Sequence, residues 1–271
     1  MRPLLLACAA VASLLAAVAP AAAQGSRRDR EDPELIVEPG GRTGTCDQLL
    51  FTPDGKQLLA AGDDKVVRVW QCRDGKLDDK TMQNLRWGIW REFRGQIHAM
   101  ALSPDARRVV IGGVGPISST VAVLSLADGG VTNVAVPKFE QGNNVGIEAA
   151  AFAPSGGRAA VGAADGSVWV WDLKSGDKPG REPRRLGKHD GAVNGFNRIR
   201  LLRFLDEKTL VSAAEFGNDV LRWDADAEKE TKPTVLFNLG AKAGLYRVEL
   251  SPDGKRLAAA PYRPEIGRAH V

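Results

Sequence analysis

The chain has 271 residues, with 37 Lys and Arg against 33 Asp and Glu, a formal net charge of +4. This near balance of charge, with 44% hydrophobic residues, argues against a disordered chain and against a dedicated nucleic-acid surface. The 30 glycines and 15 prolines are typical of a globular chain of short elements and turns, and not of a coiled coil or a collagen-like rod.

The N-terminus has the pattern of a secretory signal peptide. Arg2 precedes an apolar run from Leu4 to Ala19, and Ala21-Ala22-Ala23 then forms a small-residue cleavage site. An uncleaved anchor is the first alternative, but the run is shorter than the roughly 20 residues that span a bilayer. A lipoprotein signal at Cys8 is the second, and it leaves almost no apolar region ahead of that cysteine. We therefore expect residues 1–23 to be removed and the protein to be exported to the periplasm, the cell surface or the medium.

The mature chain repeats one pattern with a period of about 50 residues. Each copy has an apolar residue before a turn, and a Trp follows 19 residues later in the first, third and fourth copies, at Trp70, Trp171 and Trp223. The apolar anchors of the five copies are Phe51, Leu102, Phe152, Phe204 and Leu250.

Each copy predicts strands, because short Val, Ile, Leu and Ala runs lie between Pro-Asp-Gly, Asp-Gly and Gly-Asn turn signals. In the first copy we expect strands at residues 46–51, 57–61 and 66–71, and a fourth near residues 87–93. Four antiparallel strands in each period predict the blade of a β-propeller.

These residues resemble the WD-repeat (tryptophan–aspartate repeat) propellers. The family's Trp-Asp pair is present as Trp171-Asp172 and Trp223-Asp224, becomes Trp70-Gln71 in the first copy, and is lost as Leu124-Ser125 in the second. A loose match to the Gly-His element is Gly187-Lys188-His189-Asp190. The resemblance implies hydrogen bonds that link a His, a turn Asp and the Trp indole, and therefore a structural role for His189. The repeat residues that it marks as structural are Asp64, Trp70, Asp165, Trp171, Asp172, His189, Asp219, Trp223 and Asp224.

Counting the copies predicts an all-β fold with four full blades and the start of a fifth, an incomplete ring. Because WD-repeat propellers usually close with seven blades, we interpret the chain as truncated, with a leader over residues 24–34 and the propeller over residues 35–264. Residues 34–37 are interpreted either as an outer strand of the final blade or as an exposed leader. The heptapeptide 265–271 matches one translation of a sequencing adapter, so we expect a non-native tail there, the alternative being an ordinary C-terminus.

A search for catalytic groups is mostly negative. The sequence has no Cys-x-x-Cys, His-Glu-x-x-His, Gly-x-Ser-x-Gly or phosphate-loop motif, and we expect no catalytic residue, metal or cofactor. The carboxylates of residues 224–228 are interpreted as a solvated turn, because they lack the rest of a calcium loop. Cys46 and Cys72 lie at opposite ends of one predicted blade, which predicts two free thiols.

One constellation predicts a binding face. Four residues before each anchor, the innermost strand of every copy carries a polar or amphipathic side chain, which a propeller would gather in an arc at one mouth of its central channel. The alternative is a solvated rim without a partner. The five residues are Asp47, His98, Glu148, Arg200 and Tyr246.

Two further groups are given structural interpretations. Trp87 and Trp90 are expected to pack between blades rather than form an aromatic contact site. The basic residues between Lys178 and Lys188 are expected to lie in a solvated connector rather than at a polyanion site.

The sequence therefore predicts an exported interaction scaffold with protein partners, no nucleic-acid partner, no membrane span after cleavage and no catalysis of its own. The first alternative is the non-catalytic propeller part of a larger exported enzyme or signalling protein. A propeller that is itself a hydrolase or quinone-dependent oxidoreductase is a third interpretation, weakened by the lack of a His or carboxylate cluster on the inner strands. Fold alone decides between none of these.

Overall fold

A computed structural model describes residues 44–87, 95–114, 121–135, 137, 145–173, 182–238, 244–251 and 253–261, without the side chains of residues 133–135 and 261. The chain divides into two units, 1–41 and 42–271, and all described residues belong to the second. The predicted signal peptide, the leader, the strand at residues 34–37 and the tail at residues 265–271 lie outside the described residues. Within the part described, no helix is long and apolar enough to cross a membrane.

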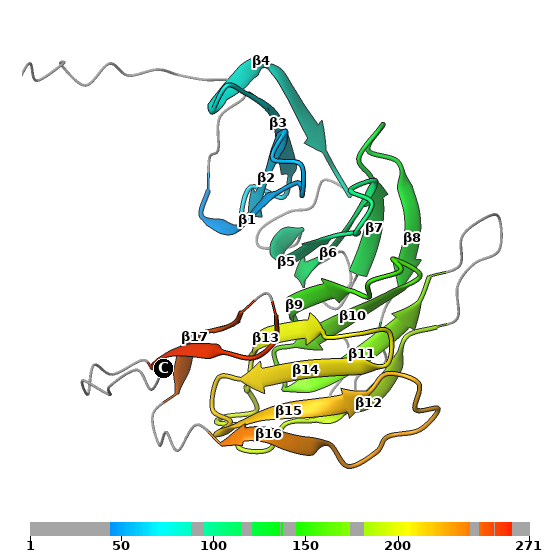
Figure 1. Cartoon of the computed structure of the whole chain (residues 1–271), viewed down its shortest axis with the longest axis vertical. Coiled ribbons are helices and arrows are strands. Elements are labelled where there is room, and N and C mark those ends of the chain that lie inside the picture. The colour runs from blue at the N-terminus through cyan, green and yellow to red at the C-terminus, as the bar shows by residue number, and fades with distance from the viewer. Residues whose placement is uncertain are drawn as a thin grey trace, which may run out of the picture. The chain divides into compact units, whose positions relative to one another are not determined.

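The described residues form four antiparallel sheets of four strands each and one sheet of two strands (Figure 1). Within each sheet the strands follow chain order, so every four-stranded sheet is a meander of hairpins. The strands are β1 Cys46–Phe51, β2 Gln57–Gly62, β3 Val67–Arg73, β4 Lys76–Leu85, β5 Gln96–Leu102, β6 Arg108–Val114, β7 Val121–Ser125, β8 Val131–Ala135, β9 Ile147–Phe152, β10 Arg158–Ala163, β11 Ser167–Asp172, β12 Arg184–Lys188, β13 Ile199–Phe204, β14 Thr209–Ala214, β15 Asp219–Asp224, β16 Thr234–Asn238, β17 Leu245–Leu250 and β18 Leu257–Pro261.

The fold class predicted from the sequence is confirmed: the described chain is all-β, with four complete blades and two strands of a fifth. The first three strands of the first blade lie within two residues of their expected bounds.

The position predicted for the fourth strand of the first blade is wrong. β4 covers Lys76–Leu85 and ends before Trp87. The cause is a two-residue turn at Asp74 and Gly75, whose φ angles of 52° and 72° are both positive. Such a turn joins antiparallel strands directly, so Arg73 pairs with Lys76 and β4 begins at once.

The apolar core lies between neighbouring blades. In the third blade β11 alternates two sets of side chains, and Trp169 and Trp171 pack in a cluster with Val110 and Val123 of the second blade. Val168 and Val170 face the other way and pack in a cluster with Trp223 of the fourth blade. Because β11 is covered on both faces, five of its six residues are buried.

The two faces of β1 differ in burial. Leu50 of β1 packs in the cluster that joins the first and second blades. Leu49 and Phe51 point to the opposite face, where each is 59% exposed. The alternation of β1 therefore distinguishes an inter-blade face from a face that the described residues leave open.

Side-chain hydrogen bonds stabilise the turn between the first two strands of a blade. The Thr52 hydroxyl donates to the Asp54 carboxylate at 2.6 Å, and Ser103 donates to Asp105 at 2.6 Å in the second blade. These carboxylates also accept the backbone N–H two residues further on. The hydrogen bond from the Thr52 hydroxyl, followed by that from the Lys56 N–H, lowers the pKa of Asp54. Burial opposes this shift, and the charge of Lys56 and the N–H of Asp54 itself add to it.

Cys46 and Cys72 are free thiols, as predicted. Cys46 starts β1 and pairs with Gly62, whereas Cys72 lies at the far end of β3 and pairs with Leu77 of β4.

Candidate functional site

The five residues predicted to form an arc share one backbone feature. The register of each innermost strand skips one residue where it pairs with the second strand of its blade, for example between Ile97 and Ala99 or between Ile199 and Leu201. Such an extra residue is a β-bulge, which bends the strand and re-aims a side chain. The skipped residues are Asp47, His98, Glu148, Arg200 and Tyr246.

The structure brings all five bulge residues to the wall of one cavity of about 630 Å³, which we call the mouth cavity. Asp47 and Tyr246 are exposed, and His98, Glu148 and Arg200 are half-buried. The inner strands that carry them come from five successive blades, and neighbouring inner strands are in contact from β1 through β5, β9 and β13 to β17. The wall is therefore built from one continuous row of contacting inner strands.

The charges along the mouth cavity alternate in sign. His98 Nδ1 lies 3.6 Å from Glu148 Oε1, and the same oxygen lies 3.8 Å from Arg198 Nε. Arg198 Nη1 and Arg200 Nη2 then lie 3.3 Å and 2.9 Å from Glu215 Oε2. This chain of ion pairs crosses two blade boundaries, from the second blade to the third and from the third to the fourth, and holds these side chains in place.

The environment shifts the pKa values of the His98–Glu148 pair. The hydrogen bond to Glu148 raises the pKa of His98; burial acts in the opposite direction, and the charges of Glu148, Asp47 and Asp63 raise it further. For Glu148, burial works to raise the pKa, but His98, Arg198 and Arg200 outweigh it and the net shift is downward. Both shifts favour an imidazolium paired with a carboxylate.

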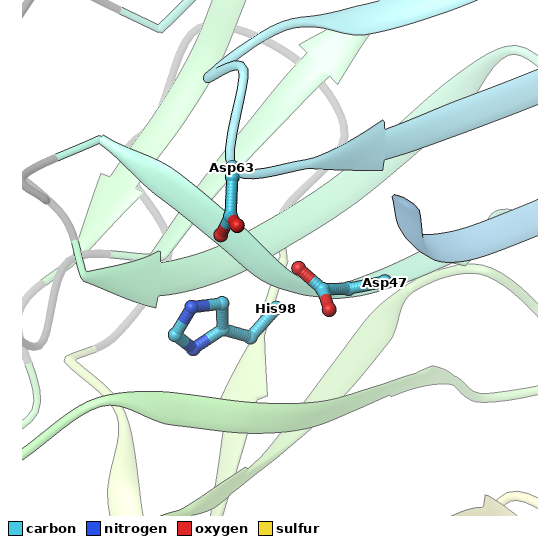
Figure 2. A group of neighbouring side chains, drawn as sticks. All are labelled: Asp47, Asp63 and His98. Carbon is cyan, nitrogen blue, oxygen red and sulfur yellow. The ribbon is translucent and has the colours of Figure 1, made fainter. Parts of the chain in front are cut away.

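At the first-blade end of the arc, two carboxylates approach the same imidazole. One ligand-type atom from each of Asp47, Asp63 and His98 lies within 4.8 Å of the others. Figure 2 shows Asp63 at the end of β2 and Asp47 on β1, with both carboxylates on one side of the His98 ring. The Gln96 side chain donates to Asp63 Oδ1 at 2.8 Å, and Gln48 donates to the carbonyl of His98 at 2.6 Å.

Sequence reasoning missed two acidic residues of this site. Asp63 and Glu215 each directly follow the second strand of their blade, where the N–H of Asp63 donates to Thr45 and that of Glu215 to Arg198. The repeat pattern could have identified these two residues, because they occupy equivalent positions in the first and fourth copies. Their approach to bulge residues depends on how the strands pair.

His189, predicted to be a structural residue, lies in a buried hydrogen-bond network with a partner that the sequence did not identify. Its Nε2 lies 2.7 Å from the hydroxyl of Ser212, which also accepts the indole N–H of Trp223 at 2.7 Å. His189 and Ser212 are buried, and the imidazole meets the Trp223 ring edge-on at 5.9 Å between centroids. The turn position that would hold an Asp is Gly217, so this network has no carboxylate among the described contacts.

In the third blade the hydrogen bonds run through a different Trp from the expected one. Trp169, not Trp171, donates its indole N–H to Ser167 at 2.9 Å, and the Ser167 hydroxyl donates to Asp165 at 2.6 Å. Trp171 is buried in the apolar cluster between blades. The signal for both serines was a hydroxyl within an otherwise apolar run, since a buried hydroxyl needs a partner.

Asp172, the aspartate of the first Trp-Asp pair, joins two blades. Its carboxylate accepts from Arg158 Nε at 2.8 Å and from Arg184 Nη1 at 2.7 Å. Arg158 continues to Asp226 at 2.9 Å, and Arg184 donates to the carbonyl of Ala227 at 3.0 Å, both in the fourth blade. Asp226 is exposed and lies in a turn, as the interpretation of residues 224–228 expected, and its ion pair with Arg158 also links the third and fourth blades.

The basic residues near the end of the third blade also differ from their interpretation as a connector loop. Arg184, Arg185 and Lys188 belong to β12. Arg185 pairs with Glu230 at 2.5 Å and Lys188 with Asp165 at 3.4 Å. Lys178 and Arg181 lie outside the described residues.

The remaining predicted structural residues have separate neighbours. Asp64 pairs with Arg68, and Trp70 is half-buried in β3. Asp219 accepts from the Asn238 side chain at 2.8 Å, and Asp224 accepts the N–H of Asp226 at 2.9 Å. Trp87 donates to the carbonyl of Gly95 at 3.0 Å and packs against the cluster between the first two blades, whereas Trp90 lies outside the described residues.

A family model described as WD domain, G-beta repeat, matches residues 39–71 and 128–172. The two matches cover the first three strands of the first blade and much of the third, and they support a relationship to the WD-repeat family. No curated protein matches the chain.

Proposed function

We propose that this protein is an exported interaction scaffold that binds a protein partner at the mouth cavity and carries out no catalysis of its own. The observation that carries the proposal is the shared bulge position, which places one side chain from each of five successive inner strands on one cavity wall. A recognition surface of this kind gains affinity from residues that are already held in place, because little ordering entropy is lost on binding.

The charges along the arc support a polar contact with the partner, with acidic groups at one end and basic groups towards the other. The acidic pair Asp47 and Asp63 lies at one end of the arc, and Arg198 and Arg200 lie towards the other. The exposed ring of Tyr246, at 63% exposure, adds an aromatic contact of the kind enriched in protein interfaces. We expect the partner to present basic groups opposite the aspartates and acidic groups opposite the arginines.

The experiment compares partner capture by matched variants of the exported protein, cross-linked in extract of the source organism. Asp47→Lys and Tyr246→Ala change exposed side chains of the arc, and we expect each to reduce capture of the same partner at least about tenfold. Leu77→Ala is the control, because Leu77 is an exposed residue of β4 that does not line the cavity. Equal capture by all four proteins would rule out the mouth cavity as the binding face.

Export is tested separately. We expect the mature protein to begin at Gln24 and to be found outside the cytoplasm. Mass spectrometry of the purified N-terminus decides this, and an intact residue 1 on cytoplasmic protein would contradict it.

A further inference from the structure

We infer that Asp47, Asp63 and His98 form a binding site for a first-row divalent transition-metal ion, with Zn²⁺ as the best-fitting ion, at the first-blade end of the mouth cavity. The three ligand-type atoms lie within 4.8 Å of one another, so small side-chain rotations would bring them to the roughly 3.4 Å separations of a tetrahedral ion with bonds of about 2.0–2.2 Å (Figure 2). The inference does not rest on the proposed function, because the ion-binding residues all belong to this chain and the site is tested on the protein alone.

The donor set determines the class of ion. An imidazole nitrogen suits zinc and its neighbours, whereas calcium and magnesium prefer oxygen ligands alone. Two carboxylate oxygens and one nitrogen leave a fourth position of a tetrahedral site open, as in zinc sites that also hold water or a ligand. The open position would face the mouth cavity, since Asp47 and His98 both line it.

The surrounding contacts are those of a supported metal site. A ligating histidine usually donates its other ring nitrogen to a carboxylate, which sets the tautomer and the ring orientation. Here His98 Nδ1 faces Glu148 Oε1 at 3.6 Å, which leaves Nε2 for an ion beside the aspartates. The hydrogen bond from Gln96 orients the Asp63 carboxylate in the same way.

The backbone supplies a second, independent feature. Asp47 and His98 both occupy bulge positions, so neighbouring inner strands aim corresponding side chains at the same point. The carbonyl of His98 accepts from Gln48 at 2.6 Å, which ties the second blade's bulge to the first blade. Asp63 reaches the same point from the turn that follows β2. Three separate backbone segments therefore converge on one position.

The test measures binding of Zn²⁺ to the untagged, metal-stripped protein by calorimetry. We expect one ion per chain. His98→Ala, Asp63→Asn and Asp47→Asn should each weaken binding by more than the roughly 10–100-fold that loss of an outer-shell partner costs, and Glu148→Gln should fall within that range. Co²⁺ bound in place of Zn²⁺ should give the absorption of a nitrogen- and oxygen-ligated ion, and His98→Ala should abolish it.

Three controls separate this site from other donors. His189→Gln and His270→Ala remove the other two histidines of the chain, and Cys46→Ser removes the thiol next to Asp47. We expect all three to bind Zn²⁺ like the parent protein. The fold of each variant is checked by its melting temperature in chelator, and Asp47→Asn decides the matter if Asp63→Asn is unstable, because Asp47 is exposed.

Three results would overturn the inference. No binding to the metal-stripped protein would mean that the three residues form an ion-pair cluster only. Loss of binding in Cys46→Ser with retention in His98→Ala would place the ion on the thiol. Binding of Ca²⁺ as tight as that of Zn²⁺ would mean a nonspecific acidic pair.

Discussion

His189 Nε2 lies 2.7 Å from the hydroxyl of Ser212 in β14, although 23 residues separate them in the chain. His189 follows the outer strand of the third blade, and Ser212 lies in the second strand of the fourth, so this contact joins the two blades. Because Ser212 also accepts from Trp223, one buried hydroxyl satisfies two neighbouring side chains.

Burial lowers the pKa of His189 from 6.5 to about 4. The fold therefore favours the neutral imidazole, and this contribution to stability is complete above pH 6.5 and is lost as the pH falls toward 4. We expect wild-type protein to lose about 2 kcal/mol more than His189→Gln between pH 8 and pH 5, measured by urea unfolding. Parallel stability curves for the two proteins would show that His189 does not titrate in this way.

Gly162 lies at a close approach between the third and fourth blades. A Cβ added to it would stand 2.5 Å from Cβ of Ile199 in the next blade. We expect Gly162→Ala to destabilise the protein by about 1–3 kcal/mol, because the blades must separate to admit a methyl group. The control is Gly146→Ala, whose nearest neighbour would be at 3.4 Å. Equal unfolding free energies for the two variants would contradict the close approach.

Ala106 occupies a turn position that holds glycine in three other blades. Its φ of 54° is in the left-handed region, as are those of Gly55, Gly156 and Gly254. We expect Ala106→Gly to stabilise the protein by up to about 1 kcal/mol, since relief of backbone strain exceeds the added entropy of the unfolded chain. Gly55→Ala is the reverse change at the equivalent position of the first blade. Because nothing lies within 4 Å of the new Cβ, only backbone strain acts, and we expect a lower melting temperature.

Asp172 binds two arginines that both reach into the fourth blade. Asp172→Asn weakens both charge-assisted hydrogen bonds, and we expect it to cost about 2 kcal/mol in urea unfolding. Asp224 is the matched control, because it is the aspartate of the next Trp-Asp pair and accepts a hydrogen bond within its own turn. If Asp224→Asn lowers the free energy of unfolding as much as Asp172→Asn does, then the two arginine contacts of Asp172 add no stability beyond that of a hydrogen bond within a turn.

Sequence patterns determined the repeat, the all-β class and most strands of the first blade, because turn chemistry and strand alternation act over a few residues. They also identified the shared position of Asp47 and His98, since an equivalent residue in each repeat has an equivalent place in each blade. The same local reasoning failed at β4, where the Asp74-Gly75 turn was overlooked.

Tertiary structure alone decided which side chains meet. Asp63 joins Asp47 and His98, and Ser212 joins His189 and Trp223, only because strands from adjacent blades stack with a particular register. Register depends on bulges and on packing between blades, which no short segment encodes by itself. The repeat and its blades were therefore readable in the chain, whereas the carboxylate–imidazole group and the hydroxyl that links two blades became visible only in the folded protein.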